Sequence, residues 1–154
     1  MADRMVIDSS VAAKWFLDDE ADVDLAESIL VAILAGDIQG HIPRVAFYEV
    51  CNLLTKACQT RSKVPPGNRI ARDRAAECIR EFLALPLERP DVTKEECLQA
   101  FELAVDHSKR HADMVFLWRA IELNCQWCTA DERLFEACRP SFPKSHVLLL
   151  SSMR

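Results

Sequence analysis

Short apolar runs alternate with longer stretches of helical periodicity along the 154-residue chain. The runs near residues 5–7, 39–43, 86–88, 125–130 and 146–150 have the length of strands, and apolar residues recur every three or four positions between them. Strands separated by helical segments are typical of parallel sheets with right-handed crossovers. The sequence therefore predicts an α/β fold, a three-layer α/β/α arrangement around a mostly parallel sheet of about five strands.

Several local signals set expected boundaries within this pattern. Ser10 is a candidate N-cap for a helix over VAAKWFL, and the TKEE segment is a candidate capping box, with Thr93 accepting from the backbone and Glu96 reaching back. Two prolines and a glycine predict a loop at residues 62–68. The final run, HVLLL, is expected to form an edge strand.

The length of the chain fits a single domain covering residues 1–154. The N-terminus has a short apolar run and an acid where a signal peptide would carry a longer apolar core, and no segment approaches the length of a membrane span. We therefore expect a cytoplasmic protein.

Charge is unevenly distributed, although the net charge is only −5. Residues 18–27 contain six acids, whereas residues 56–80 contain seven basic residues and two acids. Either stretch on its own is compatible with a solvated helix face. If bound cations offset a cluster of acids, the basic stretch instead becomes a candidate surface for contacting RNA or DNA phosphates.

Seven cysteines are present, an odd number, and most lie on apolar faces of expected helices or strands. This favours reduced, buried thiols. Cys125 and Cys128 form a C-x-x-C, and His107 and His111 form an H-x-x-x-H, so zinc and redox roles are alternatives. The pair falls in and beside an apolar strand, and no helix begins at Cys125 to lower its pKa, which disfavours both.

Four acids, Asp8, Glu49, Asp113 and Asp131, each lie where an apolar segment meets a loop or where a helix begins. Acids carried by separate strand–helix units converge if the strands are parallel, because such sheets bind ligands at the carboxyl ends of their strands. Clustered carboxylates repel one another unless a cation is bound, and Mg²⁺ and Mn²⁺ prefer carboxylate and water oxygens. The pattern therefore indicates metal-assisted attack of water on a phosphodiester. Taken singly, each acid is also compatible with a helix cap, a dipole partner or a solvated residue.

The order and spacing of these motifs resemble the PIN-domain family, most closely its VapC-type toxins. VIDSSVAAKWFL resembles the opening strand of the family with its D-x-S, and PRVAFYEVCNLL resembles the second motif with its helical glutamate. ADMVFLWRAIELNCQWCTADERL resembles the segment that carries the third and fourth acids and the closing T-x-D. The chain differs from the family at His111-Ala112, where an aromatic residue often precedes the third acid, and in its longer 60–80 region and tail.

The resemblance implies that Asp8, Glu49, Asp113 and Asp131 are catalytic and hold Mg²⁺ or Mn²⁺. Ser10 and Thr129 would orient a carboxylate or a water. It also implies metal-dependent cleavage of RNA, a homodimer, and neutralisation by a small antitoxin protein. The resemblance to VapC-type toxins therefore implies an endoribonuclease that acts as the toxin of a toxin-antitoxin pair.

Two other classes of protein are compatible with parts of the pattern. A catalytically inactive PIN-like module would use the basic 56–80 region to hold RNA or a protein, although four acids then have no function. A phosphoryl-transfer enzyme or receiver domain would often carry adjacent acids after the first strand and a late lysine, whereas Ser9 follows Asp8 here. Trp15, Trp118 and Trp127 are candidates for stacking on bases, but core or interface positions fit them better.

Overall fold

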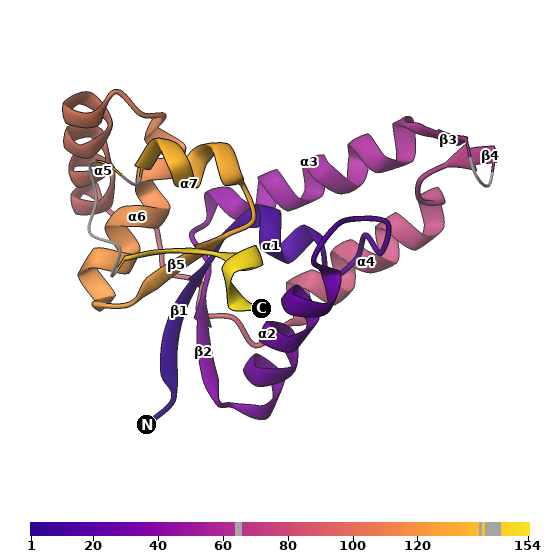
Figure 1. Cartoon of the computed structure of the whole chain (residues 1–154), viewed down its shortest axis with the longest axis horizontal. Coiled ribbons are helices and arrows are strands. Elements are labelled where there is room, and N and C mark those ends of the chain that lie inside the picture. Colours follow the sequence, from indigo (N-terminus) through magenta and orange to yellow (C-terminus); the bar gives the residue numbers. More distant parts are fainter. Residues whose placement is uncertain (64–65, 139, 141–145) are drawn as a thin grey trace.

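A parallel four-stranded sheet forms the centre of the computed structural model, which describes residues 1–63, 66–138, 140 and 146–154. Its strands lie in the order β2-β1-β5-β6, all pairs being parallel (Figure 1). Their bounds are β1 Asp3–Ile7, β2 Ile38–His41, β5 Gln126–Thr129 and β6 Val147–Leu149. The strand order changes direction at β1, so the crevice outside the carboxyl ends of β1 and β5 is the expected binding position in this class of sheet.

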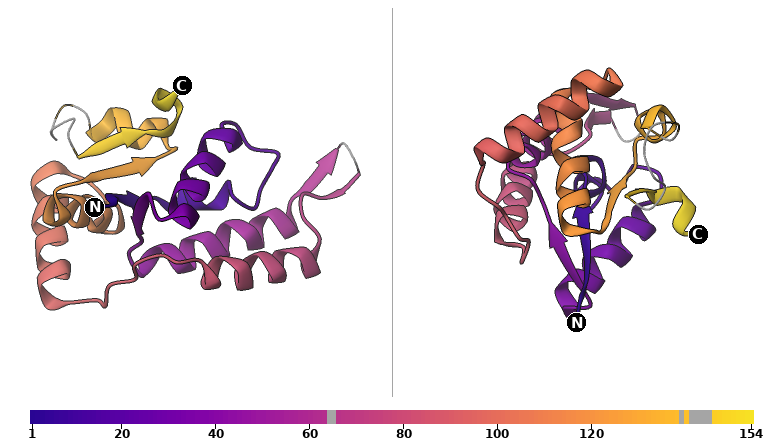
Figure 2. Two further views of the ribbon diagram at one scale, coloured as in Figure 1. Left: turned by 90° about the horizontal axis from the view of Figure 1, so that it is seen from below. Right: turned by 90° about the vertical axis from the view of Figure 1, so that its left-hand side faces the viewer.

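Seven α-helices and a 3₁₀ helix are found in the described part of the chain. Their bounds are α1 Ser9–Ala13, α2 Val23–Ala35, α3 Val45–Gln59, α4 Arg72–Ala84, α5 Lys94–His107, α6 His111–Leu123, α7 Glu132–Cys138 and η1 Leu150–Met153. Helix α2 contacts β2 and helix α6 contacts β1 and β5, and Figure 2 shows helices on both sides of the strands. The predicted α/β class with a parallel sheet is confirmed.

The sheet differs from the sequence-based expectation in its fifth strand. Residues 86–88 contribute one parallel bridge, His41 with Glu88, in which Glu88 N donates to Gly40 O (2.8 Å) and Ile42 N donates to Glu88 O (2.9 Å). Strand β6 lies at the edge of the sheet, as predicted for HVLLL.

Helices α3 and α4 lie side by side and project from the sheet as an arm (Figure 1). At its tip, β3 (Arg61–Lys63) and β4 (Pro66–Asn68) form an antiparallel ladder, so the predicted loop over 62–68 is wrong for its described residues. Residues 64 and 65 lie outside the described chain. Proline and glycine exclude a helix but not a short two-stranded ladder, and Gly67 has a φ of 142° that L side chains rarely adopt.

Two predicted caps have different outcomes. Helix α1 is capped by Asp8, whose side chain accepts from Ser10 N, so the prediction of Ser10 as the cap is wrong by two positions. Thr93 caps α5 as predicted, accepting from Glu96 N at 3.1 Å. The carboxylate of Glu96 instead accepts from Arg119 of α6 at 2.6 Å, because the buried guanidinium of Arg119 is within its reach.

The core is one cluster of apolar side chains between the sheet and its helices. Val6 and Ile7 of β1 are buried beside Trp127 and Cys128 of β5, and the indole of Trp127 stacks on Phe116 of α6 at 5.7 Å between centroids. Such close packing positions the ends of β1 and β5 relative to each other.

All seven cysteines are free thiols, and Cys78, Cys128 and Cys138 are buried, whereas Cys97 is exposed on α5. The prediction of buried thiols is confirmed for these three residues and wrong for Cys97. Helix α5 packs mainly on α6, which leaves Cys97 and Phe101 facing away from the core.

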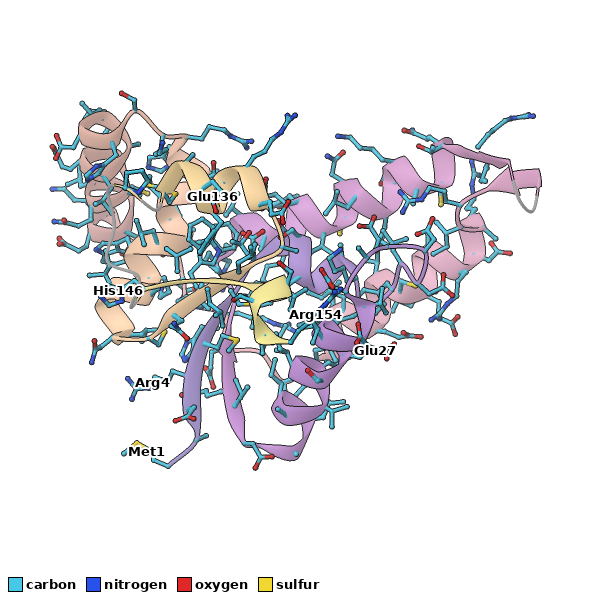
Figure 3. The ribbon with its side chains drawn as sticks, in the orientation of Figure 1. Met1, Arg4, Glu27, Glu136, His146 and Arg154 are labelled. Carbon is cyan, nitrogen blue, oxygen red and sulfur yellow. The ribbon has the colours of Figure 1, made fainter. Side chains whose placement is uncertain are left out.

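The end of the chain folds back onto α2, where η1 packs and Arg154, labelled in Figure 3, donates to Asp22. Across residues 1–63, 66–138, 140 and 146–154, no helix is both long and apolar enough to cross a membrane.

Candidate active site

The four acids singled out in the sequence lie around the carboxyl edge of the sheet. Asp8 directly follows β1, and Asp131 lies two residues after the end of β5. Glu49 is in the second turn of α3, and Asp113 is in the first turn of α6. Their positions in the fold are those that the strand–helix alternation predicted.

Asp8 is almost completely buried, with 7% of its surface exposed. Its Oδ1 accepts from Trp127 Nε1 at 3.0 Å, and its Oδ2 accepts from Ser10 N at 3.1 Å and Ser10 Oγ at 2.5 Å. Burial raises the pKa of this carboxyl to about 6, against the opposing effect of these hydrogen bonds, and the charge of Glu49 raises it further. The site therefore holds a carboxylate that is fixed in orientation and poorly solvated, a state that a nearby cation would stabilise.

Glu49 reaches the same region through Ser9, whose Oγ donates to Glu49 Oε2 at 2.7 Å. Since Ser9 is the residue after Asp8, this bond ties α3 to the end of β1. Together with the electrostatic effect of Glu49 on Asp8, it makes these two acids one pair. Ser9 was not singled out in the sequence, because its partner lies 40 residues away.

Ser10 and Thr129 connect the ends of β1 and β5. Ser10 Oγ accepts from Ala130 N at 3.0 Å while it donates to Asp8, and it lies 3.5 Å from Thr129 Oγ1. Thr129 Oγ1 accepts from Asp131 N at 3.1 Å. Both hydroxyls therefore orient the backbone and one carboxylate at the positions where the sequence suggested orienting groups.

Asp113 and Asp131 form a second pair. Burial raises the pKa of Asp113, Arg110 lowers it, and the charge of Asp131 raises it. Arg110 Nε lies 3.9 Å from Asp113 Oδ2, at the limit of an ion pair. Asp131 is exposed, and its Oδ1 accepts from Leu134 N at 3.0 Å, so it also serves the capping role that its sequence position allowed.

The acids occur as these two pairs and not as one compact cluster. Within the described residues, no group of three or more His, Cys, Asp and Glu side chains is arranged to hold a metal ion. Mg²⁺ commonly takes one or two carboxylates and completes its coordination with water and substrate phosphate, so the donor chemistry of either pair fits Mg²⁺ or Mn²⁺.

Within the described residues, Cys125, Cys128, His107 and His111 do not come together as a metal site. Cys128 is buried in the core, and burial raises its pKa to about 12, so its thiolate is strongly disfavoured. Nε2 of His111 lies 3.0 Å from Cys97 O, where it holds the start of α6 against α5. Cys128 and His111 therefore both serve the fold.

The tryptophans serve the fold in different ways. Trp127 is buried and donates to Asp8, a site role that the sequence did not suggest. Trp15 Nε1 donates to Ala26 O at 2.8 Å and joins the segment after α1 to α2. Trp118 is partly buried and lies under the guanidinium of Arg119, 5.1 Å from it.

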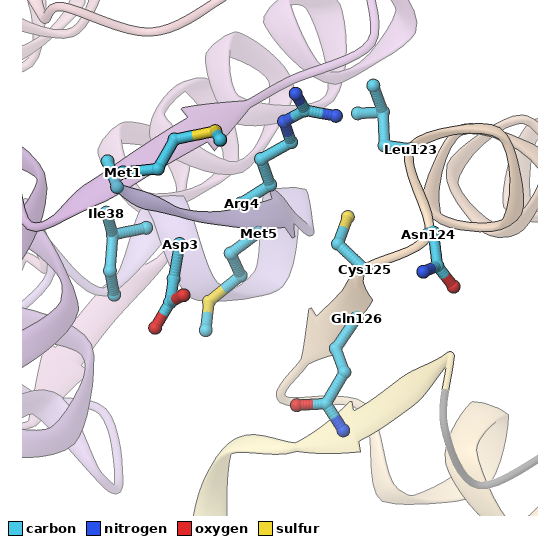
Figure 4. Close-up of a pocket in the computed structure, with 10 residues that line it drawn as sticks. Met1, Asp3, Arg4, Met5, Ile38, Leu123, Asn124, Cys125 and Gln126 are labelled. Atoms are coloured by element: carbon cyan, nitrogen blue, oxygen red, sulfur yellow. The ribbon is translucent and has the colours of Figure 1, made fainter.

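A groove of about 350 Å³ opens beside Asp131. Its lining combines Ser10, Ala130 and Asp131 from the site with Lys14, Glu20, Lys56 and Arg69 from neighbouring segments. A second hollow, of about 500 Å³, is lined by the amino-terminal ends of β1, β2 and β5 and contains none of the four acids (Figure 4). The candidate active site is therefore the groove at the carboxyl edge of the sheet, and not the hollow at the opposite edge.

Without metal, the protein is expected to lose stability as the pH rises from about 4 to about 6. The folded pKa of Asp8 is about 6 and its ordinary value is 3.8, so the folded chain holds a proton that the unfolded chain has lost over this interval. The slope of unfolding free energy against pH is then negative, with a total contribution of about 3 kcal/mol. Urea unfolding in EDTA at several pH values, for wild type and Asp8→Asn, measures it. If the unfolding free energy of wild type and of Asp8→Asn depended on pH in the same way, the raised pKa of Asp8 would be contradicted, since asparagine does not titrate.

A sequence model of one protein family, described as the PIN domain, matches residues 5–140. No curated protein matches the sequence. Among solved structures, the chain is similar to VapBC2 from Rickettsia felis bound to a DNA fragment from their promoter, with 13% identity and a TM-score of 0.64 over 95% of this chain and 98% of that one. VapC20 from Mycobacterium tuberculosis, described as a Sarcin-Ricin loop cleaving toxin, has 15% identity and a TM-score of 0.64 over 92% and 98%. A toxin-antitoxin complex from Klebsiella pneumoniae has 13% identity and a TM-score of 0.61 over 95% and 97%. At these identities, the structural matches establish a common fold.

Proposed function

The chain belongs to the PIN-domain family, and on this premise we propose that it is a metal-dependent endoribonuclease, the toxin of a toxin-antitoxin pair. The observation that carries the proposal is the placement of Asp8, Glu49, Asp113 and Asp131 around one edge of the sheet, with Asp8 buried and its pKa raised. Burial of this carboxylate disfavours its charged form even though Trp127 and Ser10 donate to it, and strongly shifted pKa values gather at functional sites.

Each residue has a role in the proposed site. The two acid pairs are the proposed ligands of Mg²⁺ or Mn²⁺, whose chemistry is to polarise a phosphodiester and to promote loss of a proton from water. Trp127 and Ser10 donate to opposite oxygens of Asp8 and so restrict the rotation of its carboxylate. Ser9 restrains Glu49, and Thr129 orients the start of the segment that carries Asp131. Such restraint reduces the reorganisation needed when substrate binds.

The proposed partners follow from the relatives. The structure from Klebsiella pneumoniae is described as a toxin-antitoxin complex, which supports a small antitoxin protein as the partner of this chain. We also propose a homodimer, which size-exclusion chromatography with light scattering will test: a monomer at working concentration would contradict it.

The function is tested by incubating purified protein with a mixed cellular RNA pool in Mg²⁺, in Mn²⁺ and in EDTA. Metal-dependent cleavage that EDTA abolishes is the expected result. Calorimetric titration of metal into the same preparation accompanies the assay. Metal binding with cleavage supports the proposal; RNA binding without metal binding or cleavage would replace it with the inactive-module alternative.

A further inference from the structure

The acidic and basic stretches of the sequence meet at the groove beside the site. Arg69, just before α4, donates through Nε and Nη2 to the two carboxylate oxygens of Asp19, both at 2.7 Å. The same Nη2 donates to Glu20 Oε1 at 2.9 Å. Lys14 Nζ donates to the other oxygen of Glu20, Oε2, at 3.3 Å. Glu20 therefore bridges two cations from separate parts of the chain, with one oxygen on each.

The exposure of these groups differs from that of ordinary surface ion pairs. The side chain of Lys14 is only 9% exposed and that of Arg69 is 26% exposed, whereas Glu20 is 36% exposed and lies over both. Lys14 and Arg69 are thus each less exposed than the carboxylate of Glu20 that covers them.

The groove links Glu20 and its two cations to Asp131. Lys14, Glu20 and Arg69 line it together with Lys56 and Thr60 of the arm, and it continues to Ser10, Ala130 and Asp131. Two oxygens of a phosphodiester can engage two separated cations as the two oxygens of Glu20 do, and arginine binds phosphate through paired N–H donors. Asp19 keeps the guanidinium of Arg69 oriented when Glu20 leaves.

We propose that Lys14, Lys56 and Arg69 form a subsite for a backbone phosphate of single-stranded RNA next to the cleavage site, and that Glu20 occupies this subsite when RNA is absent. The inference rests on the proposed function, because it supplies the path of the substrate on one side of the acids. It also gives Glu20 a specificity role: weakly bound nucleic acid must compete with an internal carboxylate, which reduces non-specific association in a protein of net charge −5.

The test is the binding of a fluorescently labelled single-stranded RNA of mixed sequence to the full chain, measured by anisotropy in EDTA so that metal-dependent cleavage is prevented. Glu20→Gln is expected to tighten binding about threefold to tenfold at low salt, the range expected when one competing ion-pair partner is removed. Glu81→Gln is the matched control, because Glu81 pairs with Arg74 at 2.8 Å outside the groove and the change in net charge is the same. Its effect on affinity should be less than about twofold.

Substitution of the basic residues is a second test of the same subsite. Arg69→Gln and Lys56→Gln should each weaken binding about threefold to tenfold and reduce the slope of log affinity against log salt by about 0.7, the value for one lost phosphate contact with a single strand. Arg80→Gln, an exposed residue of α4 outside the groove, should leave the slope unchanged. In the double variant with Arg69→Gln, most of the gain from Glu20→Gln should disappear.

The outcomes separate this inference from the proposed function. Equal affinities for Glu20→Gln and Glu81→Gln, or RNA binding undetectable in every variant, would overturn the subsite. Cleavage by the wild type with unchanged binding in the groove variants would overturn the subsite and leave the nuclease proposal standing. Groove-dependent binding without cleavage would support the subsite and overturn the nuclease proposal. A gain in affinity for Glu20→Gln is not explained by misfolding, and thermal unfolding of each variant checks the losses.

Discussion

Asp8→Asn is expected to reduce metal-dependent RNA cleavage on the order of a thousandfold, the loss that corresponds to several kcal/mol of transition-state stabilisation by a bound metal. The substitution keeps the size of the side chain but removes the charge that would attract the cation. Its amide also cannot accept at both positions where Asp8 does, since Trp127 donates to one oxygen and Ser10 to the other. Single-turnover cleavage of one labelled RNA by equal amounts of wild type and variant measures the effect.

Asp113→Asn extends this prediction to the second acid pair and should cause a loss of similar size. Asp37→Asn is the matched control, because Asp37 is exposed and lies just before β2 at the opposite edge of the sheet. It should cut RNA at the rate of the wild type. Full activity in Asp8→Asn and Asp113→Asn would remove the acids from the mechanism, and equal losses in all three variants would indicate a general effect on folding.

Arg119→Met is expected to lower the free energy of unfolding by about 3–5 kcal/mol, the usual effect of removing one partner from a buried ion pair. Arg119 donates to Glu96 at 2.6 Å and to Glu122 at 2.5 Å, and both Arg119 and Glu96 are buried between α5 and α6. Methionine retains much of the volume but leaves the carboxylate of Glu96 buried without its cation. Urea unfolding monitored by circular dichroism measures the loss.

Two further variants identify the cause of that loss. Arg74→Met removes an exposed arginine that pairs with Glu77 and Glu81, both at 2.8 Å, and should leave the free energy of unfolding nearly unchanged, because solvent screens exposed ion pairs. The double variant Arg119→Met with Glu96→Met should recover much of the stability, because an apolar pair replaces the isolated charge. A small effect of Arg119→Met alone would mean that Glu96 is solvated in the folded protein.

The candidate site was predictable from the sequence to the extent that it depends on strand ends. Asp8, Ser10 and Thr129 lie at the ends of apolar runs, and parallel strands bring such ends to one edge whatever the rotamers of the side chains. Ser9 and Trp127 were not predictable as site residues, because their bonds to Glu49 and Asp8 join positions 40 and 119 residues apart. Pattern along the chain carries no information on such contacts until the sheet order is known.

The ion pairs of the protein were also not predictable from the sequence. The acidic 18–27 stretch and the basic 56–80 stretch are each compatible with a separate solvated face, yet Asp19 and Glu20 of the first pair with Arg69 of the second. An ion pair between segments 50 residues apart depends on the projection of the arm and on the path of the chain after α1. Neither is encoded in local composition, because both follow from how the helices pack.

The periodicity and order of the segments were enough to predict the class of fold, the parallel strands and the edge at which the four acids gather, because local propensity and backbone geometry specify these features. The packing of the folded chain was needed to show that the acids form two pairs, that Asp8 is buried with its pKa raised to about 6, and that Glu20 pairs with Lys14 and Arg69. Burial, desolvation and ion pairing depend on distances between residues far apart in the chain, and the packing of the core sets those distances.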